Sequence, residues 1–110
     1  MSREEPLHSG VPGLSPGEIE RLAMLAEECS EIVQMVGKIL RHGYHSYHPD
    51  RPSISNMALL ERELGDLEAV VRLMAKRGDM SMSLVTAARI SKMERAEQYL
   101  HYNTFRDLLA

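Results

Sequence analysis

The sequence contains only one cysteine and has no apolar run long enough to cross a membrane. Cys29 has no partner within the chain, which excludes a disulfide framework and favours a reducing, cytoplasmic setting. The opening residues, Met-Ser-Arg-Glu-Glu-Pro, lack the apolar core of a signal peptide, and no stretch approaches about 18 apolar residues. We therefore expect a protein that is neither secreted nor inserted into a membrane.

The slightly acidic balance of the chain also limits its partners. A formal net charge of -3 at pH 7 argues against a general binder of nucleic-acid polymers. Single nucleotides remain possible ligands, because their phosphates can be held through metal ions. With 44% hydrophobic and 26% charged residues, the 110-residue chain has the composition of one globular domain. Because a chain of this size buries only about two-thirds of its surface, we expect a homo-oligomer, either a dimer or a tetramer.

Local signals place the first long helix after an N-terminal arm. Residues 1–14 are rich in proline and glycine and are expected to form a flexible arm, with the helical domain over residues 15–110. The helix begins at the capping-box pattern Ser15-Pro16-Gly17-Glu18. It is expected to end near His42, with Gly43 as a left-handed stop. Apolar residues at three- and four-residue steps predict its buried face: Ile19, Leu22, Ala23, Ala26, Cys29, Val33, Val36 and Leu40.

A second helix is expected after a loop that contains two prolines. The loop spans Tyr44 to Ser55, and either Ser55 or Asn56 caps the helix that follows. This helix should end before Gly78. Its predicted apolar stripe comprises Leu60, Leu64, Leu67, Val71 and Met74.

A third helix is expected from about Ser81 to Tyr99, with Asp79 or Ser81 as its cap. Thr104–Ala110 is expected to add a short helical turn. No strand-like alternation is visible in the sequence. The sequence therefore predicts an all-α fold, an antiparallel bundle of three long helices that is completed by oligomerisation.

Four carboxylates occur as two pairs on the first and second predicted helices. Glu28 and Glu31 form one pair, Glu63 and Asp66 form the other, and Glu27 lies directly beside the first pair. Residues three apart share a helix face, so packing of the two helices would gather about four negative groups in a small volume. Burial of unpaired carboxylates costs several kcal/mol, and no basic residue lies between the members of either pair. The pattern therefore predicts a hard cation with oxygen ligands, Mg²⁺, Mn²⁺ or Ca²⁺ rather than zinc.

These acidic residues also carry a resemblance to a known family. Two motifs match it, Glu27-Glu28-Cys29-Ser30-Glu31 and Glu63-Leu64-Gly65-Asp66. Their order and helical setting resemble the MazG-like all-α nucleoside triphosphate pyrophosphohydrolases, in particular the small single-domain branch that phages often carry. The resemblance covers about residues 18–100 of the chain.

The resemblance implies an enzyme that hydrolyses nucleoside triphosphates to the monophosphate and pyrophosphate with Mg²⁺ or Mn²⁺ as cofactor. It implies a place in the cytoplasm of a bacterium or of a phage-infected host. A purine deoxynucleotide such as dGTP is the favoured substrate, with dUTP or dCTP as alternatives. By the resemblance, catalytic roles fall to Glu27, Glu28 and Glu31, and metal binding falls to Glu28, Glu31, Glu63 and Asp66.

Basic residues near the predicted helix ends are candidates for binding the substrate phosphates. Lys38, Arg41 and His42 follow the first acidic motif within three turns, and Lys92 and Arg95 share one face of the third helix. Relatives in the family carry basic residues similar to the second pair. The alternative is that these side chains are the cations commonly found near helix C-termini.

The histidines and tyrosines around the first loop have several possible roles. His42, His45 and His48 have three-residue spacing, but Gly43 ends the helix and no cysteine is nearby, which disfavours a zinc site. Tyr44, Tyr47 and the imidazoles could stack on a base or line a pocket mouth, or simply form an ordered loop. A rival for the whole chain is a non-enzymatic helical oligomerisation module, whose acids would be solvated or paired with basic residues.

Overall fold

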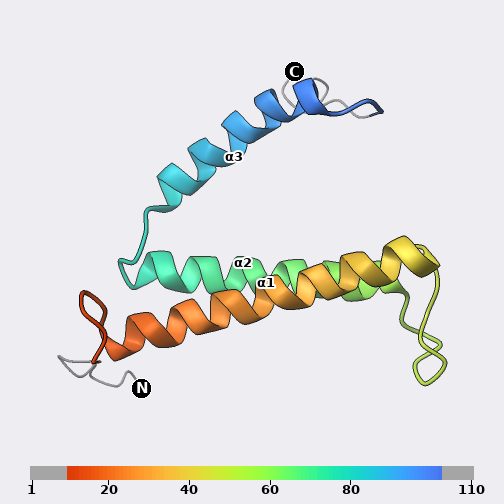
Figure 1. Ribbon diagram of the computed structural model, residues 1–110, viewed down its shortest axis with the longest axis horizontal. Helices are drawn as coiled ribbons and strands as arrows, with labels where there is room; N and C mark the ends of the chain where they lie inside the picture. The colour runs from red at the N-terminus through yellow and green to blue at the C-terminus, as the bar shows by residue number, and fades with distance from the viewer. Residues whose placement is uncertain (1–9, 103–110) are drawn as a thin grey trace. The chain divides into compact units, whose positions relative to one another are not determined.

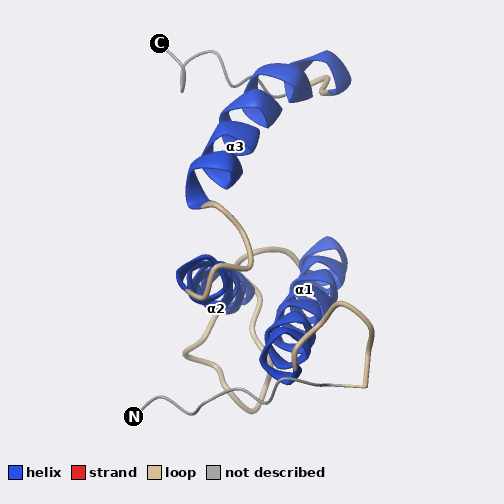
Figure 2. Cartoon of the chain, turned by 90° about the vertical axis from the view of Figure 1, so that its left-hand side faces the viewer, coloured by secondary structure: helices blue, strands red, loops and turns tan. Residues whose placement is uncertain are grey.

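The computed structural model describes residues 10–102, and its regular structure is helical. Its elements are the α-helices α1 (Pro16–His42), α2 (Asn56–Lys76) and α3 (Met82–Ala96), followed by the 3₁₀ turn η1 (Glu97–Tyr99). Figure 2 shows helices joined by loops and no strand within this part of the chain. The predicted all-α class is confirmed. Most of the predicted N-terminal arm and the predicted turn over Thr104–Ala110 lie outside the described residues.

The ends of α1 follow the capping signals in the sequence. The Ser15 backbone N–H donates to Glu18 Oε1 at 2.9 Å, and the Glu18 backbone N–H donates to Ser15 Oγ at 3.1 Å, which completes the predicted capping box. At the other end Gly43 adopts a φ of 88° and a ψ of 166°, where a side chain would be strained. Gly43 ends the helix as predicted, but in an extended conformation with positive φ rather than in the predicted left-handed helical one. Its backbone N–H donates to the carbonyl of Ile39 at 2.7 Å. Both predicted boundaries of α1 are confirmed.

The loop between α1 and α2 is fastened where the two helices meet it. Ser55 caps α2, because its Oγ accepts a hydrogen bond from the Ala58 backbone N–H at 3.1 Å. The buried side chain of Asn56 donates from Nδ2 to the carbonyl of Gly43 at 3.1 Å. An isolated antiparallel bridge joins Tyr47 to Ser55 within the loop. These contacts hold the loop against the end of the helical pair.

Helices α1 and α2 lie side by side and antiparallel, and this hairpin carries the core (Figures 1 and 2). Met35 on α1 and Val70 and Met74 on α2 are its buried apolar residues, and Met74 is only 2% exposed. Burial of such side chains contributes about 1.5–3 kcal/mol each relative to full exposure. Close packing along the hairpin therefore fixes which side chains of α1 face α2.

The face that α1 turns toward α2 differs from the predicted one. Val33 and Leu40, two members of the predicted buried face, are 70% and 81% exposed. The physical reason is that α1 carries apolar residues on two faces, and Ile32 and Met35 are the ones that are half-buried or buried. The exposed residues form a row, here called the α1 stripe: Leu22, Ala26, Cys29, Val33, Val36 and Leu40.

The stripe predicted for α2 is largely confirmed. Met74 is buried and Leu60, Leu67 and Val71 are half-buried, whereas Leu64 is 47% exposed. Val70, which was not in the predicted stripe, is buried in its place at 5% exposure.

The chain divides into two compact units between Asp79 and Met80. The hairpin of α1 and α2 belongs to the first unit, and α3 belongs to the second. Ser81 caps α3 as predicted, since its Oγ accepts from the Leu84 backbone N–H at 3.4 Å. The packing of α3 as the third member of a bundle stays a prediction. No helix within residues 10–102 combines the length and the apolar character needed to span a membrane.

Candidate functional site

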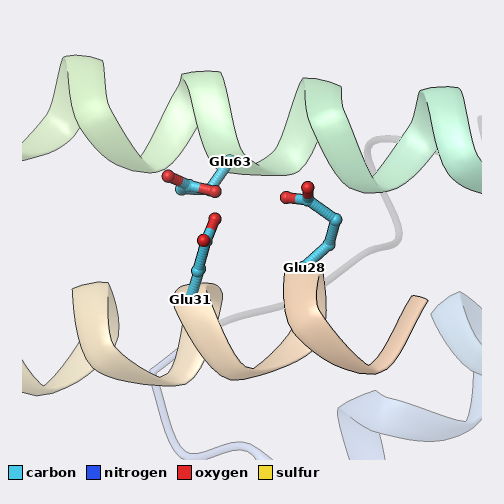
Figure 3. Close-up of side chains that lie close together, drawn as sticks. All are labelled: Glu28, Glu31 and Glu63. Atoms are coloured by element: carbon cyan, nitrogen blue, oxygen red, sulfur yellow. The ribbon is translucent and has the colours of Figure 1, made fainter. Parts of the chain in front are cut away.

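Three of the predicted carboxylates meet between α1 and α2. Glu28, Glu31 and Glu63 each place one carboxylate oxygen within 4.8 Å of the other two. Figure 3 shows Glu28 and Glu31 pointing from α1 toward α2, where Glu63 points back at them. All three side chains are half-buried. The hairpin therefore brings together acidic residues that are more than thirty positions apart in the sequence.

The local sequence explains why these residues face one another. Glu28 and Glu31 are one turn apart on α1 and share a face with the half-buried Ile32 and the buried Met35. On α2, Glu63 shares the face of Val70, seven positions later. Apolar packing at Met35 and Val70 therefore carries the three glutamates into the interface, even though their own burial is unfavourable.

The electrostatics of the cluster show that the carboxylates are crowded. Partial burial is the largest cause that raises the pKa of Glu28, followed by the negative charges of Glu31, Asp66 and Glu27. The pKa of Glu31 is also raised, first through a hydrogen bond with Glu63 that exists only while a proton is shared, and then through the charge of Glu63. Coupled carboxylates of this kind hold protons more strongly than isolated ones. The crowding therefore favours anything that reduces the negative charge of the cluster, either a proton or a cation.

The two remaining acidic residues of the motifs lie at the border of the cluster. Asp66 and Glu27 are exposed, and neither belongs to the group of oxygens within 4.8 Å. Their charges nevertheless act on the cluster, since both raise the pKa of Glu28. The structure thus gathers three of the four predicted metal ligands and leaves Asp66 one turn further along α2.

The cluster has the properties that a divalent metal site requires. Glu28 Oε2 and Glu63 Oε2 are both buried and lack a hydrogen-bond partner. Buried polar atoms without a partner are rare in proteins, and a bound ion or an ordered water molecule can satisfy them. Carboxylate oxygens are hard ligands of the type that Mg²⁺ and Mn²⁺ prefer. The residues present therefore fit such an ion.

A cationic pocket lies at the loop end of the same hairpin. Its volume is about 230 Å³, and it is lined by Lys38, Arg41, His42, Ser46, Tyr47, His48, Pro49 and Asn56. The three predicted substrate-binding residues of α1 thus share one cavity. The sequence did not predict that Ser46, Pro49 or Asn56 lines a pocket, because only the folded loop brings them to the end of α1.

The other predicted phosphate ligands, Lys92 and Arg95, lie on α3 and are exposed. Arg95 donates from Nε to Ser91 Oγ on the preceding turn at 3.2 Å. Both residues belong to the second compact unit, so their role at the carboxylate cluster stays a prediction.

Comparison with known protein families decides the assignment. The family model of the MazG nucleotide pyrophosphohydrolase domain matches residues 18–101. This span contains the carboxylate cluster, the pocket and α3. The chain belongs to the MazG family. No curated protein and no solved structure matches it. Membership of the MazG family indicates a nucleotide pyrophosphohydrolase and confirms the resemblance drawn from the two acidic motifs.

This MazG domain contains a buried ion pair that the sequence did not predict. Arg21 and Asp79 form a buried ion pair, with side chains only 9% and 12% exposed. The sequence allows either Asp79 or Ser81 as the cap of α3. Ser81 is the cap, and Asp79 instead accepts a hydrogen bond from Arg21. No local signal marks this pair, because the two residues meet only when the hairpin closes.

Proposed function

We propose that this MazG domain hydrolyses nucleoside triphosphates between the α- and β-phosphates and releases pyrophosphate, with Mg²⁺ or Mn²⁺ as cofactor. The observation that carries the proposal is the group of three half-buried glutamates, two of which hold a buried oxygen without a partner. Membership of a family of nucleotide pyrophosphohydrolases and a group of carboxylates that could hold a cation both support this proposal.

The carboxylates hold the cofactor in this proposal. Glu28, Glu31 and Glu63 supply the oxygens that already lie together, and Asp66 completes the set from the next turn of α2. When bound, Mg²⁺ neutralises the charge of the triphosphate and lowers the pKa of a water molecule for attack on the α-phosphorus. We assign to the exposed Glu27, the residue before Glu28, the role of orienting that water.

The basic residues hold the substrate. Lys38, Arg41 and His42 line the pocket at the loop end of the hairpin, and we assign them to the phosphates. Lys92 and Arg95, on α3, are further candidates for binding the phosphates. Together these groups offset the negative charge that remains after the cation has bound.

We propose a purine deoxynucleotide, dGTP in particular, as the substrate, and the main alternatives are dUTP and dCTP. The preference rests on the likeness of the motifs to the small phage-type branch of the family. A panel of common and modified triphosphates, tested with Mg²⁺ and with Mn²⁺, identifies the base that gives the highest kcat/KM.

We also propose that the protein acts in the cytoplasm as a homo-oligomer. The exposed α1 stripe supports assembly, because Val33 and Leu40 are apolar residues that are 70% and 81% exposed. Pairing with a second copy would bury these residues. A dimer and a tetramer both satisfy this requirement.

The experiment that tests the function measures pyrophosphate release in the presence and absence of the divalent ion. We expect activity that requires the ion, and we expect Glu28→Gln or Glu63→Gln to lower kcat/KM by about 100-fold or more. Glu61→Gln is the matched control, because Glu61 is an exposed glutamate on α2 outside the cluster. Absence of release from every triphosphate, together with no response to the metal, would support the non-enzymatic oligomerisation module.

A further inference from the structure

The cationic pocket is lined by basic residues and, among the described residues, by no carboxylate. This difference in charge bears on which end of a nucleotide lies at the loop end of the hairpin. Lys38 and Arg41 are exposed on its wall, and no carboxylate lines it. Among residues 10–102, neither side chain takes part in an ion pair. Two full positive charges therefore line one cavity without an ion-pair partner of their own in the described part of the chain. A carboxylate does lie near the wall, because Asp50 Oδ2 is 3.5 Å from Nδ1 of the lining residue His48.

The side chain of Arg41 runs back along α1 toward the carboxylate cluster. Its Nη1 would lie 3.9 Å from a Cβ placed on Gly37, one turn earlier in the helix. Long side chains on a helix lean toward its N-terminus, so this direction is the expected one. The guanidinium therefore lies over the turn of α1 that contains Gly37 rather than beyond the end of the helix.

The pocket and the cluster are neighbours on both helices. Lys38 lies seven residues after Glu31 on α1, and Asn56 lies seven residues before Glu63 on α2. Seven residues of α-helix span about 10 Å. Because α1 and α2 are antiparallel, both offsets point toward the same end of the hairpin (Figure 1). A short polyphosphate can bridge this distance.

We infer that the pocket binds the pyrophosphate end of the substrate, so that the β- and γ-phosphates lie toward the loop and the nucleoside lies on the opposite side of the carboxylate cluster. The direction of the nucleotide rests on the proposed function, whereas the binding of a pyrophosphate-type anion rests on the pocket alone. Base selection is then made outside the loop between α1 and α2.

A phosphate end suits this cavity better than a nucleobase. A base has no net charge and would leave Lys38 and Arg41 without a counter-charge, while phosphate oxygens accept strong charge-assisted hydrogen bonds from both. Tyr47 supplies one ring at the wall, but it is 55% exposed, and Tyr44 does not line the cavity. His48 can donate from Nε2, because its Nδ1 accepts from the Asp50 backbone N–H at 3.1 Å. The Asp50 carboxylate lies 3.5 Å from the same Nδ1, so the preference for an anion comes from Lys38 and Arg41.

The test titrates inorganic pyrophosphate into the full chain in the presence of a chelator, so that no divalent ion can bridge the anion to the carboxylates. Calorimetry or ³¹P NMR is expected to show binding that weakens about tenfold or more in the double variant Lys38→Gln, Arg41→Gln. The control is Lys76→Gln, Arg77→Gln, which removes the same charge at the other end of α2 from exposed residues. Equal binding by all three proteins, or no binding by the wild type, would overturn the inference.

A kinetic measurement tests the direction separately. In the pocket variant the KM for different deoxynucleoside triphosphates should rise by the same factor, because the lost contacts are to phosphates that all substrates share. A rise confined to one base would overturn the assignment and place the base in the pocket. If no triphosphate is hydrolysed at all, the proposed function fails while the pyrophosphate titration still decides what the pocket binds.

Discussion

Arg21 and Asp79 form a two-pronged ion pair that joins the start of α1 to the residues that follow α2. Arg21 Nε donates to Asp79 Oδ2 at 2.6 Å, and Arg21 Nη2 donates to Asp79 Oδ1 at 3.0 Å. Two parallel hydrogen bonds between a guanidinium and a carboxylate fix geometry as well as charge. The pair closes the hairpin at the end opposite the loop and so holds the register in which the three glutamates meet.

Asp79→Asn is expected to destabilise the hairpin, because it leaves the buried guanidinium of Arg21 without its counter-charge. We expect the Tm at pH 7 to fall by at least about 5 °C. The control is Glu68→Gln, which breaks the exposed pair between Arg72 and Glu68 and should shift the Tm by no more than about 2–3 °C. Equal shifts in the two variants would contradict a stabilising role for the buried pair.

The same pair predicts a dependence of stability on pH. Hydrogen bonding from Arg21 is the main cause that lowers the pKa of Asp79. The stabilisation of the folded state by ionised Asp79 is therefore complete above the unfolded-state pKa of about 3.9. It is lost as the pH falls through the lower folded-state pKa. Thermal melts of the wild type and Asp79→Asn should differ most near neutral pH and converge at the most acidic pH. A difference that stays constant with pH would rule out this linkage.

Divalent ions should stabilise the wild-type protein through the carboxylate cluster. At a free ion concentration of 100 times the Kd, binding to the native state adds about 2.7 kcal/mol, which raises the Tm by several degrees. Glu63→Gln should remove most of this rise and leave the metal-free protein no less stable, since it relieves repulsion with Glu31. Glu61→Gln should keep the rise in full. An unchanged Tm of the wild type in millimolar Mg²⁺ and Mn²⁺ would contradict the proposed metal site.

Acidification should weaken the metal response. The pKa values of Glu28 and Glu31 are raised in the folded protein, so their ionisation opposes folding: without metal, stability falls as the pH rises from the unfolded pKa to the folded one. A cation must displace these protons, so its affinity falls as the pH drops below the folded-state values. The Tm rise caused by Mg²⁺ should therefore be smaller at pH 5 than at pH 7.5. A rise that is larger at pH 5 would contradict the raised pKa values.

Two glycines give opposite predictions for stability. Gly37 lies inside α1 with only Arg41 Nη1 within 4 Å of an added Cβ, so Gly37→Ala should stabilise the protein by about 0.5–1 kcal/mol. Gly43 has a φ of 88°, so Gly43→Ala should destabilise it by about 1–2 kcal/mol. Chemical denaturation measures both. Destabilisation by Gly37→Ala would show that another chain or a ligand approaches α1 there.

Oligomerisation can be tested on the α1 stripe. We expect the wild type to sediment as a dimer or a tetramer. The double variant Val33→Glu, Leu40→Glu should sediment as a smaller assembly, because both residues are largely exposed within one chain. Arg72→Glu changes an exposed residue on α2 and serves as the control. A monomeric wild type would contradict the proposed assembly.

Local chemistry made the helix boundaries and the acidic pairs predictable. Ser15, Gly43 and Ser55 act through hydrogen bonds and backbone angles within a few residues of themselves, so their positions in the sequence are sufficient. The three-residue spacing of Glu28 and Glu31 fixes a shared helix face in the same way. The candidate cluster could therefore be anticipated before any packing was known.

Packing decided the rest, because it depends on residues far apart in the chain. Val33 and Met35 are both apolar residues of α1, and only contact with α2 determines that Met35 is buried while Val33 stays exposed. The closed hairpin likewise creates the pocket at Lys38 and pairs Arg21 with Asp79. By itself the sequence determined where the helices begin and end and which residues can bind a cation, since those properties are local. Only the tertiary structure decided which helix faces meet and which charges they bring together, since that choice is made by long-range packing.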